Sequence, residues 1–188
     1  MPSFATQQFL FRAYDIRGSR QHFTPDFIDA LGSAFAHLYN ATPYYPKDIP
    51  SKNSPFTQNI VSENTIIVIG YDVRLGSDII AKRLAEILTQ QGLRVIQLNL
   101  VTTPMMVFWA EQYQGHGIIV TASHSAKDIL GIKWLVNHQS PSDADIQVLY
   151  QHLINNAAQH QSDLPKDIIN QNQPLCALNK SVADKQTI

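Results

Sequence analysis

The chain has 188 residues and a formal net charge of -1 at pH 7, with 44% hydrophobic and 15% charged residues. This composition is typical of a globular domain with a sizeable core, and the charge balance gives no electrostatic case for nucleic acid or an anionic membrane surface. The single cysteine, Cys176, excludes an intrachain disulfide. No apolar run reaches membrane-spanning length, and the first residues lack a signal-peptide pattern, so we expect a cytoplasmic protein.

The N-terminal part of the chain predicts one helix after an irregular start. Residues 1–10 are expected to be an extended lead-in, and residues 11–18 a strand or loop. Thr24 at the N-cap and Pro25 at the first helical position begin a helix. Apolar residues then recur at helical spacing as far as Leu38, and this face should belong to the core.

A polar stretch with four prolines then interrupts the pattern at residues 41–63, which we interpret as an exposed insertion. Residues 65–70 form an uncharged run typical of a buried strand. Ser77 should cap the next helix and Gly92 should end it. Residues 94–100 are expected to be another strand.

The second half of the chain continues the alternation. Thr103-Pro104 should begin a helix whose large apolar residues pack in the core: Met105, Met106, Phe108 and Trp109. Strands are expected at residues 117–120 and 131–136, and a last helix from Pro141 to about Ala158. Residues 159–188 are polar and amide-rich, which is typical of a linker or tail. Together these patterns predict one α/β domain over residues 1–158, with a four-stranded, mostly parallel or mixed sheet between helices.

Two of the predicted strands run directly into polar residues. Ser123 and His124 follow the strand at 117–120, while Asp72 and Arg74 follow the strand at 65–70. In α/β proteins, ligands bind just beyond the carboxyl ends of such strands. The alternative is that Ser123 and His124 satisfy local backbone groups, and that Asp72 and Arg74 form an ion pair across their turn.

Known catalytic patterns narrow the chemistry of the serine. Ser123 lacks the Gly-x-Ser-x-Gly context of acyl-transfer serines, and the chain has neither a P-loop nor a dinucleotide fingerprint. Its seven histidines show no metal-ligand spacing. A serine that carries a phosphoryl group remains, because that chemistry needs chiefly positioning and nearby cations.

Four motifs in order resemble the phosphohexomutases, the phosphomannomutase/phosphoglucomutase family. They are Phe-Arg-Ala-Tyr-Asp-Ile-Arg-Gly at 11–18, Gly-Tyr-Asp-Val-Arg at 70–74, Thr-Ala-Ser-His at 121–124 and Gly-Ile-Lys at 131–133. The resemblance covers about residues 9 to 150 and implies the first of the four domains of such enzymes. The sequence departs from the family pattern at Tyr71, where Arg is usual, and at 125–126 and 129–130, where Ser-Ala and Ile-Leu replace Asn-Pro and Tyr-Asn.

The resemblance implies roles for individual residues. Ser123 would carry the phosphoryl group, with His124 beside it, and Lys133 would help to deprotonate the sugar hydroxyl. The residues that would bind phosphate and substrate are Arg12, Tyr14 and Arg17, and those that would support the site are Asp72 and Arg74. Arg is suited to phosphate because its donors form a fixed fork. Taken without the resemblance, Arg12 and Arg17 could equally pair with Asp15.

The resemblance also implies the reaction. A complete enzyme would interconvert hexose 1-phosphate and 6-phosphate of glucose or mannose, with a hexose 1,6-bisphosphate as intermediate and activator. Mg²⁺ would meet the phosphate on Ser123, while its aspartate ligands would come from the second of the remaining mutase domains. The chain alone should therefore be inactive. The alternative is a free-standing, non-catalytic relative that binds a phosphosugar or a protein partner, which Tyr71 and Ser125-Ala126 favour.

Overall fold

The structure is a computed structural model, and it describes residues 3–42 and 65–162, with side chains as far as residue 155. Most of the insertion expected at 41–63 and most of the tail expected at 159–188 therefore lie outside the described residues. The described elements are η1 (Ser3–Leu10), β1 (Ile16–Ser19), η2 (Arg20–His22), α1 (Pro25–Asn40), β2 (Ile66–Tyr71), α2 (Ser77–Gln90), β3 (Arg94–Leu100), α3 (Thr103–Gln112), β4 (Gly117–Val120), β5 (Ile129–Leu135) and α4 (Asp143–Ser162).

The strands form one mixed sheet in the order β1-β5-β4-β2-β3. β2 pairs in parallel with both β3 and β4, whereas β5 is antiparallel to β4 and to β1. The predicted α/β fold with a mixed sheet is confirmed. The segment expected to be strand or loop supplies the fifth strand, because residues 16–19 pair with the outer edge of β5.

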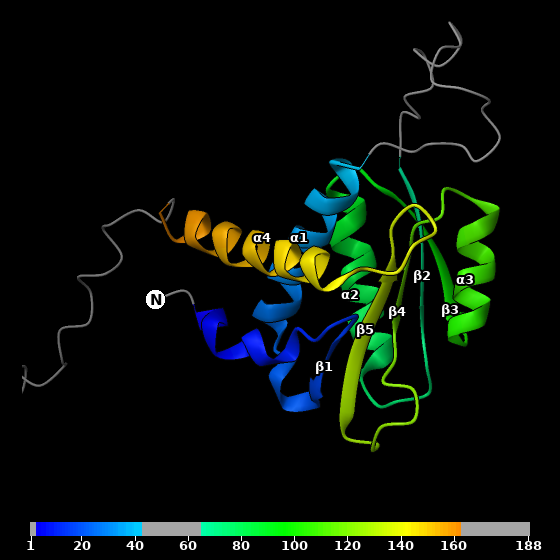
Figure 1. Cartoon of the computed structure of the whole chain (residues 1–188), viewed down its shortest axis with the longest axis horizontal. Coiled ribbons are helices and arrows are strands. Elements are labelled where there is room, and N and C mark those ends of the chain that lie inside the picture. Colours follow the sequence, from blue (N-terminus) through cyan, green and yellow to red (C-terminus); the bar gives the residue numbers. More distant parts are fainter. Residues whose placement is uncertain (1–2, 43–64, 163–188) are drawn as a thin grey trace, which may run out of the picture.

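Helices cover both faces of this sheet (Figure 1). α1, α2 and α4 lie on one face, over a large core that includes Phe27, Phe35 and Trp134. α3 lies on the other face, over a smaller cluster that includes Val68, Met106 and Ile119. The alternation of β2 explains this division, since Ile67 and Ile69 face the larger core while Val68 faces the smaller one.

α1 shows how the sequence sets an element and joins it to the sheet. Thr24 accepts a hydrogen bond from the Phe27 amide at 3.3 Å, and Pro25 occupies the first turn, as predicted. Near the other end, the buried Tyr39 hydroxyl lies 3.3 Å from the Gly117 carbonyl oxygen and 3.2 Å from that of Leu135. Burial raises the pKa of Tyr39. This hydroxyl therefore stays protonated and donates to the ends of two strands.

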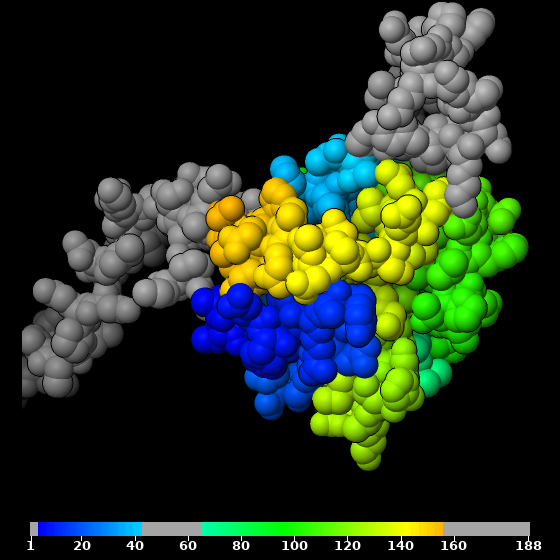
Figure 2. Space-filling model, in the orientation of Figure 1, coloured from blue at the N-terminus to red at the C-terminus, as the bar shows by residue number. Residues whose placement is uncertain are grey.

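The N-terminal segment is more ordered than the sequence indicates. Residues 3–10 form a 3₁₀ helix, so the expected extended lead-in is wrong. The buried side chains of Phe4 and Leu10 explain the difference, because they anchor the helix to the core. Phe11 packs against Tyr150 of α4 with ring centroids 5.0 Å apart, and Figure 2 shows the N-terminal segment lying along α4.

Two further predictions about helices are wrong. Ser77 is not a cap: Gly76 is the N-cap of α2, and Ser77 is fully buried with its hydroxyl directed to Asp72. In α3, of the four large apolar residues only Met106 is buried, while Met105, Phe108 and Trp109 are 48%, 58% and 40% exposed. α3 presents one narrow face to the sheet, formed by Met106 and Ala110, which are one turn apart.

The remaining boundaries differ by a few residues. β5 begins two residues earlier than expected, at Ile129, and α4 runs from Asp143 to Ser162. Ser142 and Asp145 form a reciprocal pair at the start of α4, in which Ser142 donates to the Asp145 carboxylate and the Asp145 amide donates back. Those bonds lower the pKa of Asp145. None of the described helices combines the length and apolar character needed to cross a membrane.

Candidate functional site

The carboxyl ends of β2 and β4 lie side by side, and this is where the chain changes direction across the sheet. From β2 the chain crosses through α2 to β3 on one side, and from β3 it crosses through α3 to β4 on the other. In doubly wound folds this arrangement opens a crevice in which ligands bind. The register Tyr71↔Val120 brings Asp72 beside the serine loop, which we define as residues 121–129.

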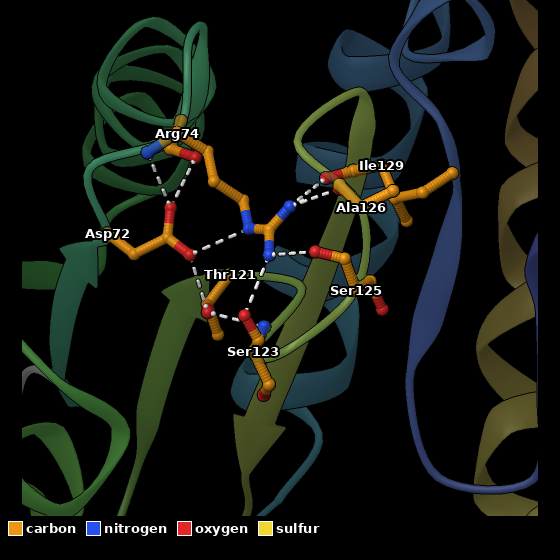
Figure 3. Close-up of polar contacts among 8 residues, drawn as sticks. Asp72, Arg74, Thr121, Ser123, Ser125, Ala126 and Ile129 are labelled. Carbon is orange, nitrogen blue, oxygen red and sulfur yellow. Dashed lines mark hydrogen bonds and ion pairs between the residues drawn. The ribbon is translucent and has the colours of Figure 1, made fainter.

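The Asp72 carboxylate joins three segments at this edge (Figure 3). Oδ1 accepts hydrogen bonds from the Arg74 amide and the Ser77 hydroxyl, both at 2.9 Å. Oδ2 accepts from the Thr121 hydroxyl at 2.7 Å and pairs with Arg74 Nε at 3.2 Å. Both oxygens of Asp72 are therefore occupied by the protein. Asp72 and Arg74 do form the ion pair that the sequence left open, and that pair extends to the serine loop.

The Arg74 guanidinium is bonded to the backbone of the serine loop. Nη1 donates to the carbonyls of Ala126 and Ile129 at 2.5 and 3.0 Å. Nη2 donates to those of Ser123 and Ser125, both at 2.7 Å. The Arg74 side chain is only 10% exposed. The loop thus has a fixed shape without the proline that the family pattern has at position 126.

Ser123 lies at the exposed tip of this loop with φ of 52°, in the left-handed region. Its amide donates to the Thr121 hydroxyl at 3.1 Å, and its carbonyl accepts from Arg74. In Figure 3 its side chain points away from the guanidinium. Within the described part of the chain, the Ser123 hydroxyl has no hydrogen-bond partner, so it is presented to solvent on a fixed backbone.

A second polar cluster lies on the neighbouring strands β1 and β5. The Asp15 carboxylate accepts from Arg17 Nε at 3.1 Å, contacts Arg17 Nη2, and pairs with Lys133 Nζ at 3.3 Å. Its side chain is 2% exposed, whereas those of Arg17 and Lys133 are 21% and 28% exposed. The sequence named Asp15 only as a possible partner of arginine. Its position between two arginines in the signature was the available signal, but nothing there indicated the contact with Lys133.

The other predicted site residues are exposed. Arg12, Tyr14 and His124 all lie at the surface, with Tyr14 67% exposed. Within the described residues, no hydrogen bond or ion pair joins any of them to Ser123. The structure therefore connects Asp72 and Arg74 to the serine loop and connects Arg17 to Lys133 through Asp15. The exposed side chains of Arg12, Tyr14 and His124 join neither group of contacts in the described part of the chain.

The residues at this edge do not form a metal site on their own. The described ranges contain no group of three or more His, Cys, Asp or Glu residues able to hold a metal ion. Asp72, the carboxylate bonded to the serine loop, already accepts four contacts from the protein. A cation at Ser123 would need ligands beyond these side chains.

The sequence was compared with models of known protein families. A family model described as phosphoglucomutase/phosphomannomutase, alpha/beta/alpha domain I, matches residues 54–160. The chain belongs to this family. The match includes β2, the serine loop and β5, so three of the four motifs that carried the resemblance, at 70–74, 121–124 and 131–133, lie entirely within it.

Individual members of the mutase family are longer than this chain. A phosphomannomutase of Vibrio cholerae is 32% identical over 139 residues, which is 72% of this chain and 26% of that protein. A phosphoglucosamine mutase of Alkaliphilus metalliredigens is 31% identical over 94 residues, or 48% of this chain and 20% of that protein. A solved phosphoglucomutase/phosphomannomutase family protein from Burkholderia thailandensis shares the fold, with a TM-score of 0.62 at 24% identity over 79% of this chain and 30% of its own. The chain thus matches about a fifth to a third of these mutases.

Proposed function

We propose that this chain is the phosphoserine-bearing first domain of a phosphohexomutase that interconverts hexose 1-phosphate and hexose 6-phosphate through a bisphosphate intermediate. The observation that carries the proposal is the serine loop itself. Arg74 binds four of its backbone carbonyls, and Ser123 lies at its tip with a hydroxyl that has no hydrogen-bond partner among the described residues. Phosphoryl transfer depends mainly on such positioning and on nearby cations.

In the proposed reaction the phosphoryl group moves from Ser123 to a hydroxyl of the bound sugar phosphate. The bond between phosphorus and Ser123 Oγ breaks, a bond from phosphorus to the sugar oxygen forms, and the hydroxyl proton passes to Lys133 in its neutral amine form. The exposed Ser123 Oγ takes up a proton from water, and Lys133 later releases its own to water. The return transfer, from the other end of the bisphosphate to Ser123, restores the phosphoserine. Arg17, with Arg12 and Tyr14 at the exposed edge of the N-terminal signature, would bind the phosphate of the sugar.

Mg²⁺ and a hexose 1,6-bisphosphate activator belong to this proposal. Mg²⁺ would offset the phosphate charge, and this chain would offer it the phosphate on Ser123, with the remaining ligands supplied by other mutase domains. The names of the relatives cover mannose, glucose and glucosamine phosphates, which supports a hexose phosphate as substrate without selecting one sugar.

A non-catalytic relative that binds a phosphosugar or a protein partner is the second candidate. Three features of the sequence favour it: Tyr71, Ser125 and Ala126 stand where the family has Arg, Asn and Pro. Against it, the loop keeps a defined shape through Arg74 although the proline is missing.

Phosphopeptide mapping separates these two candidates. After incubation of the native protein with glucose 1,6-bisphosphate and Mg²⁺, mass spectrometry should find the phosphoryl group on Ser123, and a Ser123→Ala variant should remain unlabelled. The 188-residue chain by itself should be labelled weakly and show no turnover in a coupled mutase assay with glucose 1-phosphate. Label confined to Ser125 or Ser77 would contradict the assignment. Turnover by the isolated chain that disappears in Ser123→Ala would contradict the need for further domains.

A further inference from the structure

Asp15 is a nearly fully buried carboxylate that contacts both cations of the second polar cluster. Among the described residues, its side-chain contacts converge on one oxygen, Oδ2, which meets Arg17 Nε, Arg17 Nη2 and Lys133 Nζ. Burying a carboxylate is costly unless cations and hydrogen bonds compensate it. With Arg17 and Lys133 together, the cluster keeps a formal charge of +1, which suits a site that receives a phosphate.

The backbone around Asp15 fixes its position independently of the two cations. The Arg12 amide donates to the Asp15 carbonyl at 2.9 Å, and Phe11 and Ile16 form a bridge across the same turn. Asp15 immediately precedes β1, whose pairing with β5 places Arg17 opposite Gly131. A side chain at Gly131 would meet the backbone oxygens of Thr121 and Ile16 at 2.7 and 3.0 Å, so the two strands and the start of the serine loop pack closely.

Arg17 and Lys133 have no other ion pair in the described ranges. Both have long side chains with many rotamers, and ordering each of them costs side-chain entropy. They come from different strands, so a shared partner fixes one side chain relative to the other. Asp15 is that partner, because its single Oδ2 atom lies within contact of both.

We propose that Asp15 is a positioning residue of the mutase site. Its carboxylate holds the Lys133 side-chain nitrogen and the Arg17 guanidinium at a fixed separation, so that Lys133 in its amine form can act on the sugar hydroxyl while Arg17 binds phosphate. This inference rests on the proposed function. A purely structural ion pair would affect only the stability of the fold, whereas a positioning residue also affects the reaction rate. Stability alone is a weak reason for this buried pair, because such pairs often contribute little net stability and can be replaced by apolar groups.

The test compares Asp15→Asn with the unsubstituted native protein in steady-state mutase assays. Misplacement of a reacting group by about 1 Å can cost roughly 10²-fold in rate. We therefore expect kcat to fall by about 10²-fold while KM for the sugar phosphate changes by less than about threefold. Asp26→Asn is the matched control. It makes the same change of charge at an exposed position in the first turn of α1, without a side-chain partner among the described residues, and should keep kcat within about twofold.

A second variant separates positioning from folding. Asp15→Glu keeps the negative charge but moves it by one methylene, so the ion pairs can form while the two cations shift. We expect it to fold with an unfolding temperature close to that of the parent and still lose at least about tenfold in kcat. If Asp15→Asn does not accumulate as folded protein, this variant decides the question.

The possible outcomes are distinct. Parent-like kcat in folded Asp15→Asn or Asp15→Glu would overturn the positioning role, leaving a structural ion pair. A fall in kcat equal to that of Asp26→Asn would show a general charge effect and would also overturn it. Absence of both Ser123 labelling and turnover in the unsubstituted native protein would overturn the proposed function, and this inference with it.

Discussion

Removal of the Arg74 side chain should release the serine loop from the edge of the sheet. Of its four bonds to loop carbonyls, those to Ser125 and Ile129 are partly buried, whereas water can replace those to Ser123 and Ala126. At about 1–1.5 kcal/mol for each partly buried bond and about 1 kcal/mol for the pairing lost by Asp72, Arg74→Ala should lower the free energy of unfolding by roughly 3–4 kcal/mol.

For a chain of this size that loss corresponds to a decrease of roughly 6–16 °C in the unfolding temperature. Circular dichroism during heating and urea unfolding would measure it. Amide hydrogen exchange should locate it, because the amides of Ser125 and Ile129 bond within the loop and should lose protection first. Arg83→Ala is the control: Arg83 is a half-exposed arginine paired with Asp29, and exposed pairs contribute little. A parent-like unfolding temperature with retained loop protection in Arg74→Ala would refute this reasoning.

Two further predictions concern groups away from the serine. Burial, with the nearby His138, lowers the pKa of His116 from 6.5 to about 4, so the folded protein holds it neutral and the unfolded chain protonates it first. The contribution of neutral His116 to the free energy of unfolding should therefore be complete above pH 6.5 and should decline as the pH falls toward 4. In urea titrations at each pH, the free energy of unfolding of His116→Gln should decline less over this range. Parallel curves for the two proteins would contradict this. Gly131→Ala should lower the free energy of unfolding, measured with urea, by about 1–3 kcal/mol, because its Cβ would meet backbone atoms on both sides. A parent-like urea midpoint would contradict this and show that β1 and β5 can move apart to make room.

The position of the candidate site could be predicted from sequence because it depends on strand ends. Asp72 and Ser123 each follow an uncharged run, and parallel strands bring their carboxyl ends to one edge. What holds the serine loop could not be predicted. Arg74 binds backbone carbonyls, and every residue type supplies the same carbonyl, so no residue pattern reveals the acceptors.

The errors have similar physical causes. The Met-aromatic cluster of α3 was expected in the core, but the helix buries Met106 and Ala110 alone and leaves Met105, Phe108 and Trp109 partly exposed. Asp15 was seen as a partner for arginine, whereas its contact with Lys133 depends on the pairing of β1 with β5, which are far apart in sequence. Local patterns predict elements better than they predict which elements meet.

The left-handed backbone at Ser123 restricts which amino acids can occupy the tip of the loop. Few residues other than glycine adopt a φ near 52°; asparagine and aspartate do so most readily, and β-branched residues are outliers there. Threonine, although it has the same hydroxyl group, would therefore strain the loop, so under the proposed function the backbone favours serine over threonine at this position. Aspartate satisfies the same torsion angle and carries a permanent negative charge. Ser123→Asp is thus the substitution best suited to imitate the phosphorylated loop in a form that neither turnover nor hydrolysis can remove.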